Sequence, residues 1–445
     1  EAAITAAERA AVQRLRREGR PYAEFAGRDA VADPEAATLE VESAIRAGPH
    51  YRFGPVSFEG LEAVDPAYLA TYVPWDEGAV FSSEAVGTLQ EDLAATGLFR
   101  GVAVSPPDAP PLGDAVPIEV SVQEAPFRTA GASLRFSTDE GPEGRLFLEH
   151  RNLFGANEQL FLELDAGLER QLFGAAFLKP QFLRSGQDLT AGFELRRIDE
   201  DRFEELGATL TLGLQRALGE RWTVGAGGLL EASLIDDEGD EKTALLAGLP
   251  VFARYDGSDD ELNPTTGQRL RLKATPFIGQ FDEELVTFLR LEARASAYQD
   301  LSGDGRWVLA ERARLGSIVS DSLSDVPPTR RFYSGGGGSV RGFAEDAIGP
   351  LDMANDPAGG RSVGEAGIEL RAPIWGDLGG VVFVEGGIVT EEPFIDGSED
   401  FLVAAGAGLR YYSPVGPIRI DAGFPLNGRD VDDGFQVYFS IGQAF

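Results

Sequence analysis

Residues 127–445 are built from short segments in which apolar and polar positions alternate. In Leu160–Leu168 every second residue is leucine or alanine, and phenylalanine, glutamate, aspartate and glycine lie between them. The same period of two recurs in Leu206–Gln215 and Leu289–Ser296, and it is the period of a β-strand. One face is consistently apolar while the other carries charges and glycine, over strands of about 9–14 residues. This pattern favours a barrel with lipid outside and a wet lumen over a two-layer sandwich.

The alternating segments predict about sixteen antiparallel strands, an even number as is usual for such barrels. Their expected starts are near Phe127, Arg145, Glu158, Gln171, Gln187, Arg202, Trp222, Lys242, Gly267, Glu284, Trp307, Gly364, Val381, Leu402, Ile418 and Phe435. Compact connections such as "RSGQ" and "ALGE" alternate with acidic, often longer ones such as "DDEGDE" and "TEEPFIDGSED". Short periplasmic turns and longer outer loops would produce this alternation.

Residues 1–126 mix helical and strand patterns instead. The segment Ser82–Phe99 predicts a helix with Val86, Leu89 and Leu93 on one face. With the strands around it, the order across residues 51–126 is β-α-α-β-β, which is the size of a small α+β domain. Residues 1–50 resemble the C-terminal part of a second copy. Because the chain opens within a helical pattern, we expect the natural protein to extend further in the N-terminal direction.

Charge and composition exclude several functions. The formal net charge of −34 makes nucleic acid an unlikely partner, because no basic stripe is available for phosphates. The chain has no cysteine, which suits an oxidising compartment. Only two histidines are present, so neither a Ser-His-Asp triad nor a His-rich metal site is expected. We therefore predict no enzyme activity, no metal site and no cofactor.

The stretch "SGGGGSVRGF", Ser334–Phe343, lies in the longest segment without a strand pattern, residues 320–360. Loops of this length are usually functional or disordered. The stretch matches neither a dinucleotide fingerprint nor a P-loop, and its serine lacks the spacing of a nucleophile elbow. An arginine in a wet barrel can instead form a bidentate pair with carboxylates. If the loop folds into the lumen, we expect Arg341 to fasten it to acids on the wall.

Several motifs resemble those of the outer-membrane assembly and two-partner-secretion superfamily. In chain order they are "EHRNLFGANE", "NPTTG", "SVRGF", "FVEGG" and "SPVGPIRID", which is also their order in that family. They lie within residues 149–421. The ending "VYFSIGQAF" resembles the C-terminal signal of outer-membrane barrels. Within the superfamily, the residues of these motifs are most similar to those of the TamA family, the outer-membrane subunit of the translocation and assembly module. The BamA family of general assembly factors is the next most similar.

The resemblance implies an all-β transmembrane barrel of about 16 antiparallel strands, preceded by α+β POTRA domains of order β-α-α-β-β. Domains are expected at residues 1–50 (part of a POTRA domain), 51–126 (a complete one) and 127–445 (the barrel, with loop 320–360 folded inward). It places the barrel in the bacterial outer membrane and the POTRA domains in the periplasm.

The resemblance also implies two sites. A lock would pair the loop motif, Arg341, Gly342 and Phe343, with acids on two strands, Glu369 and Glu385. A lateral seam between the first and last strands would involve Gly131, Gly442 and Phe445.

The implied function is insertion or translocation of proteins through the seam, with a BamA-like general assembly factor or a two-partner secretion pore as alternatives. The implied partners are a TamB-like inner-membrane-anchored periplasmic protein, unfolded outer-membrane protein clients and outer-membrane lipid.

Overall fold

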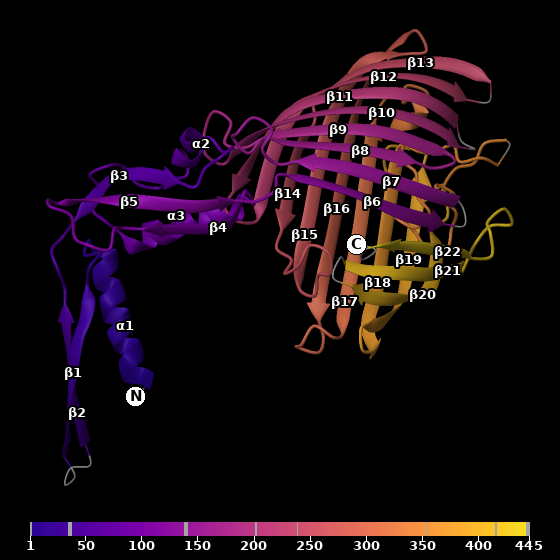
Figure 1. Cartoon of the computed structure of the whole chain (residues 1–445). Coiled ribbons are helices and arrows are strands. Elements are labelled where there is room, and N and C mark those ends of the chain that lie inside the picture. The colour runs from indigo at the N-terminus through magenta and orange to yellow at the C-terminus, as the bar shows by residue number, and fades with distance from the viewer. Residues whose placement is uncertain are drawn as a thin grey trace. The chain divides into compact units, whose positions relative to one another are not determined.

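The computed structural model describes residues 2–33, 38–137, 141–200, 203–237, 239–353, 355–413 and 416–441. It divides into two compact units (Figure 1). The first contains Glu1–Thr129 and His150–Gln159, and the second contains Ala130–Glu149 and Leu160–Phe445. Among the described residues, no helix combines the length and the apolar character needed to cross a membrane.

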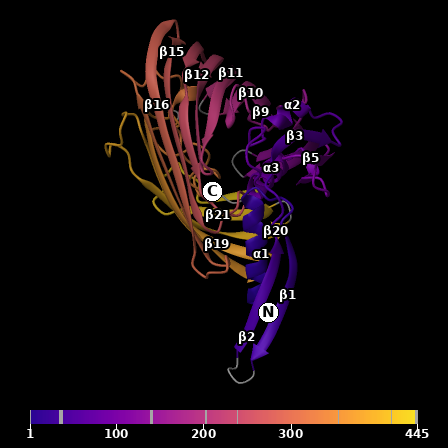
Figure 2. The same cartoon turned by 90° about the vertical axis from the view of Figure 1, so that its left-hand side faces the viewer.

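The N-terminal part of the first unit is a helix beside a two-stranded antiparallel hairpin. Figure 2 shows α1 (Ala2–Arg17) lying along β1 (Glu24–Asp33) and β2 (Thr38–Arg46). Glu8 of α1 accepts hydrogen bonds from Arg28 Nε at 2.7 Å and Ser43 Oγ at 2.6 Å, which ties the helix to both strands. Helix, strand and strand therefore follow in the order that the sequence predicts for residues 1–50.

The rest of the first unit has the β-α-α-β-β order. Its elements are β3 (Arg52–Glu59), α2 (Pro66–Ala70), α3 (Ser83–Ala95), β4 (Phe99–Ser105) and β5 (Ala115–Glu124). The sheet order is β3-β5-β4, with β3 parallel to β5. Ser82 caps α3, and Val86, Leu89 and Leu93 are buried against the sheet, as their spacing predicts.

The segment His150–Gln159, which connects two barrel strands, belongs to the first unit. Asn152 Nδ2 donates to the carbonyl of Ala63 at 3.2 Å, and Asn157 Nδ2 donates to the hydroxyl of Tyr68 at 3.2 Å. The carboxylate of Glu158 accepts the backbone N–H of Ala156 at 2.9 Å. The "RNLFGANE" motif is therefore a structured turn whose asparagines contact the loop before α2 and α2 itself.

The second unit is a closed antiparallel barrel. Its strand segments are β6 (Arg128–Ser137), β7 (Gly141–His150), β8 (Gln159–Ala166), β9 (Arg170–Lys179), β10 (Gln187–Glu200), β11 (Phe203–Leu218), β12 (Trp222–Asp237), β13 (Asp240–Gly248), β14 (Val251–Asp256), β15 (Gly267–Phe281), β16 (Glu284–Asp300), β17 (Val308–Val319), β18 (Ser362–Trp375), β19 (Leu378–Thr390), β20 (Leu402–Ser413), β21 (Gly416–Pro425) and β22 (Gln436–Ile441). Segments β13 and β14 both pair with β12 and β15, so they are two parts of one strand. Pro250 lies between them and has no N–H to donate to a ladder. The segments β6 to β22 therefore form sixteen strands, and the predicted fold class is confirmed.

The two faces of the strands separate by polarity as predicted. On β11, Leu206, Leu210 and Leu212 are more than half exposed on the outer wall, whereas Glu205 faces inward and is buried. Apolar side chains around the outside suit lipid, and the charged residues inside must satisfy one another or water.

The strand starts agree closely with the predicted ones. The largest differences are at β7, which begins at Gly141 rather than Arg145, and at β19, which begins at Leu378 rather than Val381. The predicted contrast in connection lengths is partly wrong. At the acidic "DDEGDE", strand pairing extends to Asp237 and Asp240, so the connection between β12 and β13 is short. At the other end of the barrel, the connection between β14 and β15 spans residues 257–266.

Candidate functional site

The connection between β17 and β18 folds into the barrel. Its side chains Val326, Phe332, Val340, Phe343 and Ile348 are buried. Backbone bridges pair Phe332 with Gly360 and Ser334 with Ile348, and a short 3-10 helix covers Pro328–Arg330. The loop is therefore an ordered part of the barrel interior rather than a flexible linker.

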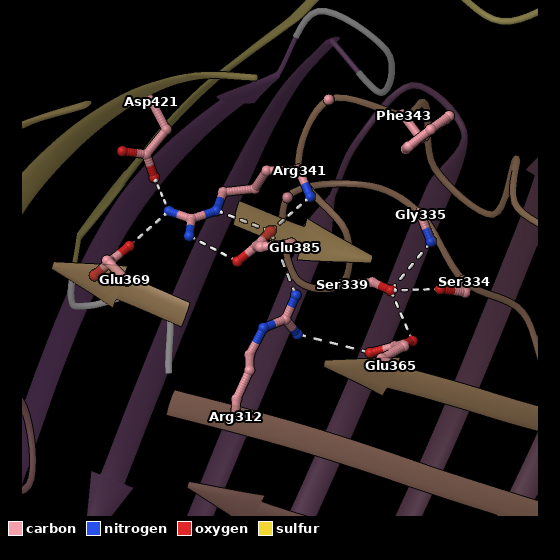
Figure 3. Close-up of polar contacts among 12 residues, drawn as sticks. Arg312, Ser334, Gly335, Ser339, Arg341, Phe343, Glu365, Glu369, Glu385 and Asp421 are labelled. Carbon is pink, nitrogen blue, oxygen red and sulfur yellow. Dashed lines mark hydrogen bonds and ion pairs between the residues drawn. The ribbon is translucent and has the colours of Figure 1, made fainter. Parts of the chain in front are cut away.

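Arg341 lies at the centre of a buried ion-pair cluster (Figure 3). Its Nη2 and Nε donate to the two oxygens of Glu385 at 2.7 and 3.2 Å, and its backbone N–H donates to Glu385 at 2.9 Å. Its Nη1 donates to Glu369 at 2.8 Å and to Asp421 at 3.0 Å. The guanidinium also lies 3.5 Å from the ring centroid of Phe383. The structure thus brings Arg341 together with the two acids named from the sequence.

Several residues of this cluster were not singled out from the sequence. Asp421 on β21 contacts Arg341, and it also accepts from Arg410 of β20. Glu369 accepts from Arg371 Nε at 2.9 Å and lies 3.5 Å from Arg410 Nη2. The signal was present, because Arg419 and Asp421 alternate with Ile418 and Ile420 and so share the lumenal face of β21.

The buried carboxylates of the cluster are all paired with arginines. Among the described residues, five guanidinium groups contact the three carboxylates Glu369, Glu385 and Asp421. They belong to Arg341, Arg371 and Arg410, and to Arg312 and Arg419, which lie 3.4 Å from Glu385 and 3.8 Å from Asp421. Arg341 is 1% exposed, and Glu369 and Asp421 are 0% exposed. Burying such charges is costly, and removing one partner leaves an uncompensated charge that costs about 3–5 kcal/mol. Arg341 lies on the loop, so the loop is held here through its contacts with Glu369, Glu385 and Asp421.

Glycines let the loop motif approach the wall. Gly342 has a φ of +109°, a backbone conformation that side chains disfavour. A Cβ on Gly423 of β21 would lie 2.7 Å from the backbone nitrogen of Gly342 and 2.8 Å from the carbonyl carbon of Arg341. The motif therefore lies directly on the backbone of β21, which explains the glycine after Arg341.

The same motif is bonded to the last strand. The hydroxyl of Tyr438 on β22 accepts the N–H of Gly342 at 3.2 Å and donates to the carbonyl of Phe343 at 2.9 Å. Phe343 itself packs with Val340, Ile348 and Leu402.

Two further anchors hold the loop. Ser339 donates to Glu365 at 2.8 Å, and Arg314 Nη1 donates to the same carboxylate at 2.8 Å. Arg330 at the start of the loop forms an ion pair with Glu231 of β12. The loop is therefore attached to strands on several sides of the barrel.

The closure of the barrel is between β22 and β6. In the described part of these strands the paired residues are Tyr438 with Ser137 and Phe439 with Phe136. The neighbouring pair, β21 and β22, shares six residue pairs from Ile418 to Gly423.

Of the predicted seam residues, Gly131 lies in β6, where a Cβ would meet the ring of Phe147 at 2.4 Å. Gly131 therefore makes room for that ring, and a weakening effect on the seam stays a prediction. Gly442 and Phe445 lie outside the described residues.

Within the described ranges, no group of three or more histidine, cysteine, aspartate or glutamate side chains is placed to hold a metal ion. The clustered acids at Arg341 already accept hydrogen bonds from arginines. What this arrangement can do is hold a loop in a defined position.

Two family models match the chain. The Omp85 superfamily domain matches residues 152–445, and the POTRA model, described as a surface antigen variable number repeat, matches residues 51–125. The outer membrane protein assembly factor BamA of Nitratidesulfovibrio vulgaris is 28% identical over 360 residues, covering 75% of this chain and 44% of that protein. BamA of Neorickettsia risticii is 25% identical over 434 residues, covering 89% of this chain and 55% of that protein. The chain thus spans about half the length of these two relatives.

Solved structures share the fold. BamA from Haemophilus ducreyi lacking POTRA domains 1–3 has a TM-score of 0.85 at 19% identity, covering 98% of this chain and 93% of that one. CdiB from Acinetobacter baumannii has a TM-score of 0.62 at 17% identity, covering 96% and 79%.

Proposed function

Because the chain belongs to the Omp85 superfamily, we propose that it assembles or translocates proteins at the outer membrane through the seam between β6 and β22. The barrel lies in the outer membrane and the POTRA region in the periplasm. The observation that carries the proposal is the short described pairing of β22 with β6, beside the longer pairing of β22 with β21.

An opened seam offers unpaired backbone N–H and C=O groups, and such an edge is a template for an incoming strand. The client strand would supply the hydrogen bonds that β6 and β22 lose, so no nucleotide is required. Tyr438 connects this edge to the loop motif, and we infer that the loop position and the seam state are coupled. We assign the protein no enzymatic activity.

The finer assignment is to the TamA family, acting with a TamB-like partner on outer-membrane protein clients. The residues of the motifs "SGGGGSVRGF" and "SPVGPIRID" support this assignment. A BamA-like role is the alternative that the named relatives favour. A neighbouring gene for a very large periplasmic protein would support the TamA role, and an adjacent large exoprotein gene would favour a secretion pore instead.

A disulfide across the seam tests the mechanism. Phe136→Cys with Phe439→Cys joins directly opposed residues of β6 and β22, and the natural chain has no cysteine. The matched control, Ala405→Cys with Phe424→Cys, joins opposed residues of β20 and β21. We expect the oxidised seam variant to lose client assembly in reconstituted vesicles and regain it on reduction, while the control stays active. Equal activity of both oxidised variants would contradict the seam mechanism.

A further inference from the structure

Four arginines lie side by side across the inner wall of the barrel. Arg254 of β14 is opposite Arg271 of β15, Arg271 is opposite Arg294 of β16, and Arg294 is opposite Arg314 of β17. We call these four residues the arginine row. Neighbouring strands are about 4.8 Å apart, so the row spans about 14 Å. Like charges directly opposite each other destabilise a sheet, so the row needs an explanation.

Acids neutralise one end of the row only. Arg314 contacts Glu365 at 2.8 Å and Glu292 at 3.2 Å, and Arg294 contacts Glu292 at 2.7 Å. Within the part of the chain that the structure describes, Arg254 and Arg271 have neither an ion pair nor a hydrogen bond, and both are exposed to the lumen. The other end of the row therefore presents unneutralised positive charge.

The row faces a cavity of about 950 Å³. Eight of the residues that line it are arginines, against five acids, in a chain whose net charge is −34. Gly335, Gly338 and Ser339 of the inward loop also line the cavity. A cleft lined by one sign of charge concentrates ligands of the opposite sign. The cavity is therefore suited to an anion with several charges.

The barrel wall behind the arginine row and the length of the row distinguish between a lipid, a single phosphate and a peptide as the bound anion. Strands β14 to β17 are paired without a register shift over the residues that carry the row, so acyl chains have no path from the cavity to the membrane. A single phosphate is smaller than the span of the row. An extended peptide carries alternate side chains on one face about 6.6–7 Å apart, so two or three carboxylates fit the row.

We propose that the arginine row binds an acidic, extended polypeptide segment inside the barrel lumen. The guanidinium groups of Arg254 and Arg271 provide forked donors for its carboxylates. This site is separate from the seam, and it is a binding function beyond the proposed assembly role.

The test measures binding by the full-length chain in neutral detergent at low salt. The probe is a short fluorescein-labelled peptide of alternating aspartate and serine, followed by anisotropy, with an asparagine–serine peptide beside it. The test variant is Arg254→Gln/Arg271→Gln. The matched control is Arg197→Gln/Arg216→Gln, which removes two exposed arginines from the outward-facing side of β10 and β11. The single variant Arg254→Gln serves if the double variant does not fold.

We expect the acidic peptide to bind the wild type and the control alike, and the row variant about tenfold more weakly. Equal binding by the row variant and the control would overturn the site. Displacement by short-chain phosphatidylglycerol at lower concentration than by unlabelled acidic peptide would overturn the occupant and indicate a lipid headgroup. The measurement involves no client assembly, so its failure would leave the proposed function standing.

Discussion

The hydroxyl of Tyr438, on the last strand of the barrel, donates a hydrogen bond to the carbonyl of Phe343 in the inward loop. The same hydroxyl accepts the N–H of Gly342, and both contacts are buried. Two neighbouring backbone groups of the loop motif thus depend on one side chain at the seam. The position of the loop and the position of β22 cannot change independently without breaking these bonds.

Tyr438→Phe removes both hydrogen bonds and keeps the ring. We expect a loss of about 1–2 kcal/mol of stability, because two buried backbone groups lose their partner. Urea unfolding, followed by the heat-dependent shift in gel mobility, measures this loss. Tyr411→Phe is the control, because Tyr411 is exposed on the outer wall of β20. Equal stability of the two variants would contradict the link between loop and seam.

Gly423→Ala tests how closely the motif approaches β21. The new Cβ would lie 2.7 Å from the backbone nitrogen of Gly342, so the loop must move or the strand must shift. We expect faster trypsin cleavage after Arg330 or Arg331 and a loss of about 1–3 kcal/mol. Gly228→Ala on β12 is the control, because nothing lies within 4 Å of its added Cβ. If the loop of Gly423→Ala resists trypsin as well as the wild-type loop does, the contact between Gly342 and β21 is not tight.

Arg341→Ala removes the one guanidinium that contacts Glu369, Glu385 and Asp421 together. We expect a loss of about 3–5 kcal/mol and release of the loop. Arg341→Lys keeps the charge but cannot reproduce the fork to Glu385, so it should recover only part of the stability. Arg184→Lys, at an exposed turn, is the control. Wild-type stability and trypsin resistance of Arg341→Ala would refute the lock.

Glu124 gives a pH dependence in the first unit. Burial alone raises the pKa of Glu124, but hydrogen bonds from the backbone N–H groups of Glu62, Ala63 and Val64 outweigh it and lower the pKa. The folded pKa is below the unfolded value of about 4.3, so the stabilisation is present above that value. It is lost as the pH falls through the folded pKa.

The measurement for Glu124 is hydrogen exchange of residues 61–65 as a function of pH. Glu124→Gln should exchange faster than wild type at neutral pH, and the difference should shrink in acid. Glu119→Gln, exposed on the same strand, should match the wild type throughout. A difference between Glu124→Gln and wild type that is constant with pH would rule out the carboxylate as the cause.

Most of the fold could be predicted from local patterns in the sequence. A strand period of two and turn residues place the strands, because each wall residue has lipid on one side and the lumen on the other. The break at Pro250 is visible in the sequence, but only the pairing of β12 with both halves shows that the strand continues. Connection lengths were less predictable, because acidic residues such as Asp237 and Asp240 suit both a strand end and a loop.

The residues of the site could be predicted from the sequence only where a single motif identifies a single residue. Arg341, Glu369 and Glu385 follow from their motifs, whereas Asp421 and Arg410 join the cluster through the register of β20 with β21. Register between distant strands is a three-dimensional property, and a period of two does not fix it. The arginine row could not be predicted from the sequence for the same reason. Its members are 17 to 23 residues apart in the sequence and lie side by side only because the strands pair.

The tight turns at the outer end of the barrel also limit what the cell surface displays. Strand β15 ends at Phe281 and β16 begins at Glu284, so almost nothing protrudes between them. In loop 320–361, the side chains of Val326, Phe332, Val340, Phe343 and Ile348 are buried in the lumen, whereas Met353 is exposed. An antibody or phage approaching from outside would therefore bind mainly residues 391–401 and 426–435, together with the exposed residues of loop 320–361. Sequence variation under such pressure should concentrate in these exposed segments and spare the interior that holds Arg341.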